Sequence, residues 1–222
     1  TSDSAGRGGD VRIRAGRLEL TGGANITTDA TSSGAPGHID VTASDAVTLS
    51  GVGSDGAPSA IASRNSGPQA GGSVSLAANH VTLRAGAEIT ASSSGAGDAG
   101  SITVRAADTL ELDAARITTN ASAANGGDVR ILVGRLVRLK GSEITADVGD
   151  GQGGTILIDP VFVVLDGSRV AAQAGAGRGG SIRIVGDTIL ISPDSVVSAS
   201  AGAAGIDGTV RIEGADSDLA AD

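Results

Sequence analysis

Few side chains of this sequence could carry acid–base or metal chemistry, and they are widely spaced. The chain has two histidines, His38 and His80, and no cysteine, which excludes a thiolate metal site and a cysteine nucleophile. His38 precedes a first predicted strand and His80 a second one. We expect the two rings in different corners, so no shared metal site and no Ser-His-Asp arrangement is indicated. We interpret both as surface histidines.

A recurring short polar position is the second candidate for chemistry. It holds, in successive repeats, Asp45, Asn79, Asp108 and Asp187. Stacked carboxylates can bind Ca²⁺ or act as an acid–base pair, as in polysaccharide lyases and hydrolases. Short polar side chains are also what a tight corner favours, and Arg135 stands nearby in a later repeat. We favour the turn interpretation, and we predict no catalytic residue, no metal and no cofactor.

Threonine recurs at a third position, directly after an apolar residue of a short predicted strand. The residues are Thr27, Thr90, Thr118 and Thr145, and we expect them to form an outward column. Threonine ladders on flat solenoids can bind ice, but such a face would need a second threonine two positions further on. Asp29, Ser92, Asn120 and Asp147 stand there instead, so β-propensity is the simpler explanation.

The elements that position these residues follow from an internal repeat. Apolar pairs separated by one residue recur at steps of 26 to 28 residues, apart from one step of 35. A spacing of two is typical of strands and not of helices. The pairs are Val11/Ile13, Ile39/Val41, Val74/Leu76, Ile102/Val104, Val129/Ile131, Ile156/Ile158, Ile182/Ile184 and Val210/Ile212.

Each repeat continues with a second apolar pair and then a single apolar position. The second pairs are Leu18/Leu20, Val47/Leu49, Val81/Leu83, Leu110/Leu112, Val137/Leu139, Val163/Leu165 and Ile189/Ile191. The single positions are Ile26, Ile61, Ile89, Ile117, Ile144, Val170 and Val196. Glycines precede each first pair, such as Gly126-Gly127, and we expect them to supply turn conformations that other residues resist.

Short strands in repeats of this length, with no helix between them, predict a coiled all-β chain. Each strand then pairs in parallel with its equivalent one coil away, at about 4.8 Å. We predict one right-handed parallel β-helix (β-solenoid) domain over residues 1–222, with about eight coils of about 27–28 residues. Residues 1–8 and 214–222 are expected to be irregular ends. An insertion at residues 51–59 accounts for the longer second coil, as a passive or a contact loop.

Composition agrees with a thin aliphatic core and excludes several partners. Phe162 is the only aromatic residue, and the net charge is −9. Nucleic-acid binding needs a basic face and stacking aromatics, so nucleic acid is excluded as a partner. No run of 18 apolar residues is present, so no membrane-spanning helix is predicted.

The repeat unit resembles the shaft repeats of filamentous-haemagglutinin-like exoproteins of bacterial two-partner secretion. The unit reads Gly-Gly-Asp-Val-Arg-Ile-Arg, then Leu-Glu-Leu-Thr, then Ala-Asn-Ile-Thr-Thr, and Gly180-Ser181-Ile182-Arg183-Ile184 is similar. The likeness covers nearly all of residues 6–213. It implies a secreted or cell-surface protein, often an adhesin, that is exported through an outer-membrane transporter partner. The amino-terminal secretion domain of that family carries Asn-Pro motifs, which are missing here, and no functional residue carries over.

Apolar residues occupy outward positions in coils five to seven, where alternation fails. Contiguous exposed apolar side chains usually mark a buried contact. We therefore predict an interface, formed with another chain or covered by an added segment. Its residues are Leu132, Leu157, Phe162, Val164, Val185 and Leu190, together with Leu136.

Three functions remain open from the sequence. The first is a non-catalytic structural shaft or adhesin segment that contacts a host or neighbouring-cell surface or a polysaccharide. The second is a β-helical polysaccharide-binding or polysaccharide-cleaving enzyme. The third is a self-stacking filament subunit or an ice-binding solenoid. No polar cap is evident at either end, so we expect a longer parent shaft or end-to-end self-association.

Overall fold

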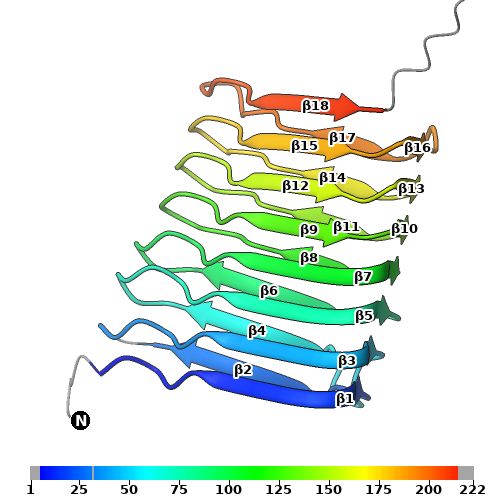
Figure 1. Cartoon of the computed structure of the whole chain (residues 1–222). Helices are drawn as coiled ribbons and strands as arrows, with labels where there is room; N and C mark the ends of the chain where they lie inside the picture. The colour runs from blue at the N-terminus through cyan, green and yellow to red at the C-terminus, as the bar shows by residue number, and fades with distance from the viewer. Residues whose placement is uncertain (1–5, 32, 215–222) are drawn as a thin grey trace, which may run out of the picture.

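The structure is a computed structural model that describes residues 6–31 and 33–214 (Figure 1). Every regular element of this part is a β-strand, and all strand pairs are parallel apart from one isolated bridge in the insertion. No helix that could span a membrane occurs among the described residues. Of the predicted irregular ends, residues 1–5 and 215–222 lie outside the described part, and residues 6–10 and 214 carry no strand.

Two sheets face each other, and both run along the axis of the coil, as Figure 1 shows. The first sheet holds β1 (Val11–Thr21), β3 (Ile39–Ser50), β5 (Val74–Arg84), β7 (Ile102–Asp113), β9 (Val129–Val133), β12 (Thr155–Asp159), β15 (Ser181–Val185) and β18 (Thr209–Glu213), with β10 (Leu136–Lys140), β13 (Phe162–Asp166) and β16 (Thr188–Ile191) beside them. The second sheet holds β2 (Asn25–Ala30), β4 (Ala60–Asn65), β6 (Glu88–Ser93), β8 (Arg116–Thr118), β11 (Glu143–Thr145), β14 (Arg169–Ala171) and β17 (Val196–Ser198).

The chain makes seven coils and begins an eighth with β18, which confirms the predicted parallel β-solenoid. Strands of the first sheet run to the right in front and those of the second run to the left behind, as the chain climbs in Figure 1. This is a right-handed coil. In the first four coils the predicted first and second strands run together as one bent strand, with a register shift at the bend in each pairing of β1, β3, β5 and β7. In coils five to seven they are separate.

Residues at equivalent positions of the sequence repeat pair with one another in the first sheet. Ile102 pairs with Val129, Val129 with Ile156, and Ile156 with Ile182, so identical repeat positions stack into inward columns. One assignment was wrong. Val197, not Val196, continues the column after Val170, because the chain takes one residue more from Ile189 to Val197 than it takes from Val163 to Val170 in the coil below. Val196 instead lies beside Arg169 and is 47% exposed.

The core is a single layer of aliphatic side chains between the two sheets. It is closed at one edge by a column of small residues on the second sheet that face the glycines before each first strand. Thr28 donates a hydrogen bond to the Gly37 carbonyl at 2.9 Å, and Thr119 does the same to Gly127 at 3.1 Å. Small side chains at this edge let the two chain segments come close together.

The glycines before the first strands have a different role from the one predicted. None of the positive φ angles falls at Gly37, Gly72, Gly100 or Gly127. A Cβ on Gly127 would lie 1.7 Å from the carbonyl oxygen of Gly100, one coil below. Close approach of successive coils therefore requires glycine at these positions, and turn conformation does not.

The insertion lies where the sequence placed it, between β3 and β4. Val52 and Pro58 form an antiparallel bridge, and the Gly53 N–H donates to the Ala57 carbonyl at 2.7 Å. The Ala57 N–H in turn donates to the Asp55 carboxylate at 3.0 Å. These contacts make the loop a small closed hairpin at the corner between the two sheets.

Candidate functional site

A network of polar side chains lies on the outer face of the second sheet, where β8, β11 and β14 are three residues long. The middle residue of each strand points into the core, so the first and third point outward. The first positions stack as Glu88, Arg116, Glu143 and Arg169, and their charges alternate in sign from coil to coil. The third positions stack as Thr90, Thr118, Thr145 and Ala171.

The predicted threonine column exists, but it is short and mostly covered. Thr90, Thr118 and Thr145 pair in register, and Thr118 donates a hydrogen bond to Thr90 at 3.1 Å. Their exposed fractions are only 3%, 8% and 6%, because neighbouring coils and longer side chains flank them. Ala62 interrupts the column between Thr27 and Thr90. The column therefore forms the floor of a groove and not a flat open face.

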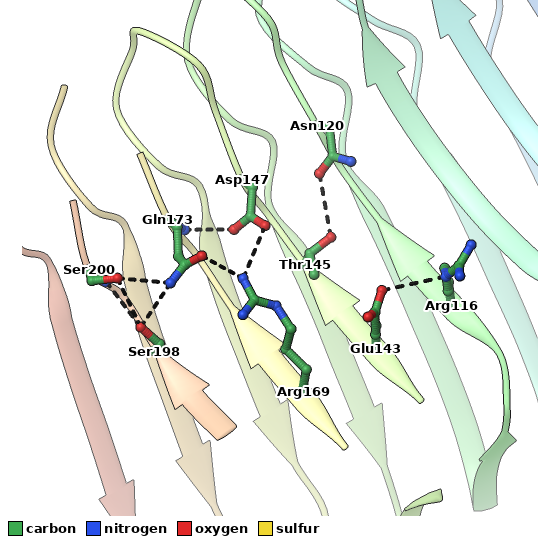
Figure 2. A network of polar contacts seen from close by, with 9 residues as sticks. All are labelled: Arg116, Asn120, Glu143, Thr145, Asp147, Arg169, Gln173, Ser198 and Ser200. Atoms are coloured by element: carbon green, nitrogen blue, oxygen red, sulfur yellow. Dashed lines mark hydrogen bonds and ion pairs between the residues drawn. The ribbon is translucent and has the colours of Figure 1, made fainter. Parts of the chain in front are cut away.

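Ion pairs connect adjacent coils along this groove (Figure 2). The Arg116 Nε lies 3.4 Å from a Glu143 carboxylate oxygen, and the Arg169 guanidinium lies 3.7 Å from the Asp147 carboxylate. Arg169 also donates to the side-chain carbonyl of Gln173. Arg116 and Glu143 remain about half exposed, with 64% and 45% of their side chains accessible. Groups of this exposure remain accessible to a ligand.

Gln173 connects the groove to the last complete coil. Its backbone N–H donates to the Asp147 carboxylate at 2.7 Å, and its side-chain amide donates to the hydroxyls of Ser198 at 3.1 Å and Ser200 at 2.8 Å (Figure 2). On the other side, Thr145 donates to the Asn120 side-chain oxygen at 3.4 Å. The polar groups near Gln173 are therefore occupied by one another, whereas those around Arg116 have spare donors and acceptors.

Asp147 is the groove residue whose ionisation the fold perturbs. Burial raises the pKa of Asp147 above its usual value of 3.8, because desolvation penalises the carboxylate. The Gln173 backbone N–H and the Arg169 charge act in the opposite direction and lower the pKa in part. Desolvation is the larger effect, so keeping Asp147 ionised in the groove lowers the stability of the fold.

The recurring acidic position does not form a carboxylate cluster. Arg17 donates to Asp45 at 2.8 Å, and the Arg135 guanidinium donates to Asp108 at 3.0 Å. The hydrogen bond from Arg135 lowers the pKa of Asp108. Each of these acids is thus paired with an arginine of the adjacent coil. Within residues 6–31 and 33–214, no three His, Asp or Glu side chains lie close enough together to hold a metal ion.

The two histidines lie in separate parts of the first sheet. His38 precedes β3, and its Nδ1 lies 2.8 Å from the Ser73 hydroxyl, while its backbone N–H donates to Asp10. His80 lies within β5 at the bend, with Nδ1 3.0 Å from the Thr109 hydroxyl and 3.5 Å from the Asp108 carboxylate, so both partners approach the same ring nitrogen. Asp10 contacts the backbone and not the ring of His38, so the Ser73–His38 pair lacks the third member of a triad.

The structure brings together only some of the predicted interface residues. Val164 and Leu190 pair directly in one column, and Leu190 is 58% exposed. Phe162, 42% exposed, lies on the same strand as Val164 and stacks on Leu136. This group, Phe162, Val164 and Leu190, is called the apolar strip below.

The other predicted interface residues are separated by polar neighbours. Leu157 lies between Arg130 and Arg183 in its column. Leu132 lies beside Asp159, and Val185 beside Glu213. These three side chains are half-buried, and each has a charged residue above or below it in its own column.

Comparison with known proteins adds no further assignment. No family model, curated protein or solved structure matches this chain. The inferences below therefore rest on the residues and their geometry.

The charged column of the groove was not predicted from the sequence. Arg116, Glu143 and Arg169 each stand directly before an inward apolar residue of the third strand. Reading that position down the repeats would have shown the alternation of charge. The sequence does not show that the insertion lines the same corner, because the direction in which the insertion folds depends on its contacts with the coils above it.

Proposed function

We propose that this chain is a non-catalytic structural segment of a secreted or surface-attached bacterial exoprotein, similar to the shaft of filamentous-haemagglutinin-like proteins. The observation that carries the proposal is the stacking of equivalent repeat positions along the whole first sheet. Equivalent repeat positions pair from β1 through β18. A ladder of this kind gives a stiff rod whose length increases by about 4.8 Å for each coil.

The distribution of charge supports a structural role. Two of the acidic corner residues that resembled a catalytic cluster pair with an arginine one coil away, Asp45 with Arg17 and Asp108 with Arg135. Cross-coil pairs of this kind hold neighbouring coils in register. An adhesin shaft of the resembled family would also use an outer-membrane transporter for export.

The test of location uses an antibody raised against residues 6–214 on intact, non-permeabilised cells that produce the parent protein. We expect labelling of the cell surface, or recovery of the protein from the medium. Labelling that requires permeabilised cells would contradict the proposal.

The test of the structural role removes one whole coil. Deleting Ile102–Asp128 joins Ser101 to Val129, which occupies the register position of Ile102. We expect the shortened chain to keep its β-sheet circular dichroism spectrum and its surface display, because the function of a spacer does not depend on the residues of any one coil. Depolymerisation of pectin, alginate or chitin that disappears in Asp108→Asn or Asp187→Asn would show a catalytic role instead.

A further inference from the structure

Two adjoining hollows, together called the groove, lie at the corner between the two sheets and on the outer face of the second sheet. One hollow, at the corner, is lined by Val52 and Pro58 of the insertion and by the small residues Gly86 and Ala114. A second hollow, on the sheet face, is lined by Thr118, Asn120, Thr145 and Asp147 among others. Glu88, Arg116 and Glu143 line both hollows. The shared residues border both hollows, so one ligand that spans the two hollows would contact all three side chains.

The insertion gives the corner hollow an apolar wall. The Val52 side chain is half exposed and reaches over Gly86, where an added Cβ would lie 3.0 Å from it. The internal hydrogen bonds of the hairpin fix this wall in place. Only the second coil has such an insertion, so the hollow occurs once along the described rod and is not a repeated feature of the solenoid.

The polar side of the groove combines donors and acceptors with little net charge. Glu88, Arg116 and Glu143 follow one another at successive coils, about 4.8 Å apart. A polyanion needs an excess of basic residues, and a polycation an excess of acids. The alternating charges of Glu88, Arg116 and Glu143 give no large excess of either sign.

An extended peptide is also a poor fit, because strand addition requires a free sheet edge. The groove lies on the face of the second sheet, where the backbone N–H and C=O groups of β6, β8 and β11 pair with the coils above and below. Recognition at this face must therefore use side chains. The ligand must offer both hydrogen-bond donors and acceptors and an apolar surface.

We propose that this groove binds a short neutral oligosaccharide. The C–H face of one sugar ring lies against Val52 and Pro58, and hydroxyls of that ring and the next one bond to Glu88, Arg116 and Glu143. Sugar hydroxyls both donate and accept, and a pair of adjacent hydroxyls matches the two oxygens of a carboxylate or the two nitrogens of a guanidinium. Successive rings of an extended chain can meet successive coils. This binding activity goes beyond the structural role proposed above and does not depend on it.

The test uses the intact chain and a set of neutral hexasaccharides: cellohexaose, laminarihexaose, maltohexaose and chitohexaose. Saturation-transfer NMR detects binding, and titration gives the dissociation constant. We expect at least one of them to bind with a millimolar or lower constant that added salt changes little. Arg116→Met, Glu143→Gln and Val52→Asp should each weaken that binding about tenfold or more.

The matched control is Arg130→Met. Arg130 is an exposed arginine of the first sheet that pairs with Asp128 at 2.7 Å, away from the groove. It should leave binding unchanged, and the circular dichroism spectrum of each variant verifies its fold. The proposal is overturned if no neutral hexasaccharide binds at millimolar concentration, or if the groove variants bind as well as the control. Binding of a heparin hexasaccharide alone, abolished by salt, would also overturn it. None of these outcomes bears on surface location or on coil deletion, so failure here leaves the structural proposal intact.

Discussion

Replacing Gly127 by alanine should destabilise the solenoid strongly, although it adds one methyl group. The new Cβ would lie 1.7 Å from the Gly100 oxygen and 3.1 Å from the Thr119 Cβ. Non-bonded Cβ contacts below 3.0 Å are essentially absent from proteins, so the two coils must separate locally by at least 1.3 Å, the difference between 1.7 and 3.0 Å. The coil above limits any movement, because the Gly127 oxygen already approaches Gly154 in the same way.

The magnitude follows from the contacts that such a separation breaks. The Ile102 N–H donates to the Asp128 carbonyl at 2.8 Å, and Thr119 donates to the Gly127 carbonyl at 3.1 Å. Two buried hydrogen bonds of about 1 kcal/mol each, together with lost packing, give a cost of about 3 kcal/mol. The smaller conformational entropy of the unfolded alanine chain returns less than about 1 kcal/mol. We expect a net loss of about 2–3 kcal/mol.

The assay is urea unfolding followed by circular dichroism, with Gly16→Ala as the matched control. Gly16 has nothing within 4 Å of an added Cβ and no positive φ, so its substitution should be neutral or stabilise the fold by up to about 1 kcal/mol. If both variants unfold at the same urea concentration, or if Gly127→Ala costs less than about 1 kcal/mol, the close-approach explanation is incorrect.

Three further predictions test the core, the groove and the apolar strip. Ile131→Ala should cost about 3–4 kcal/mol in urea unfolding, because the side chain is fully buried between sheets; a loss below about 1 kcal/mol would contradict the inward column. Burial raises the pKa of Asp147 in the folded state. Protonation of Asp147 therefore stabilises the fold, fully so below the pKa of this group in the unfolded chain, and this contribution is lost as pH rises through the folded-state pKa. The Asp147→Asn variant should therefore become more stable relative to the wild type as pH rises from 3 to 7. If urea titrations show the difference in unfolding free energy changing in the opposite direction, the burial argument is refuted. Leu190→Asp should reduce self-association in light scattering more than Leu157→Asp does, since Leu157 lies between two arginines. A chain that stays monomeric at every concentration would exclude an interface between copies of this chain.

The repeat of the sequence was sufficient to predict the parallel solenoid. Strand alternation has a period of two and the coils have nearly constant length, so only stacking in register buries every apolar pair at once. The repeat alone thus places Ile102, Val129 and Ile156 in one column. The same reasoning failed at Val196, because one extra residue in the preceding part of that coil moves every later side chain of that strand to the opposite face.

The groove and the role of the glycines required the tertiary structure. Outward residues such as Arg116 and Glu143 carry no apolar signal, and their proximity comes from coil stacking across 27 residues of sequence. Whether Val52 turns toward Gly86 or into solvent depends on contacts between coils, which local propensity does not encode. Likewise, the distance from Gly127 to the coil below is set by the ladder spacing. The sequence by itself determines which side chains face inward, and only the stacked coils decide which outward side chains meet.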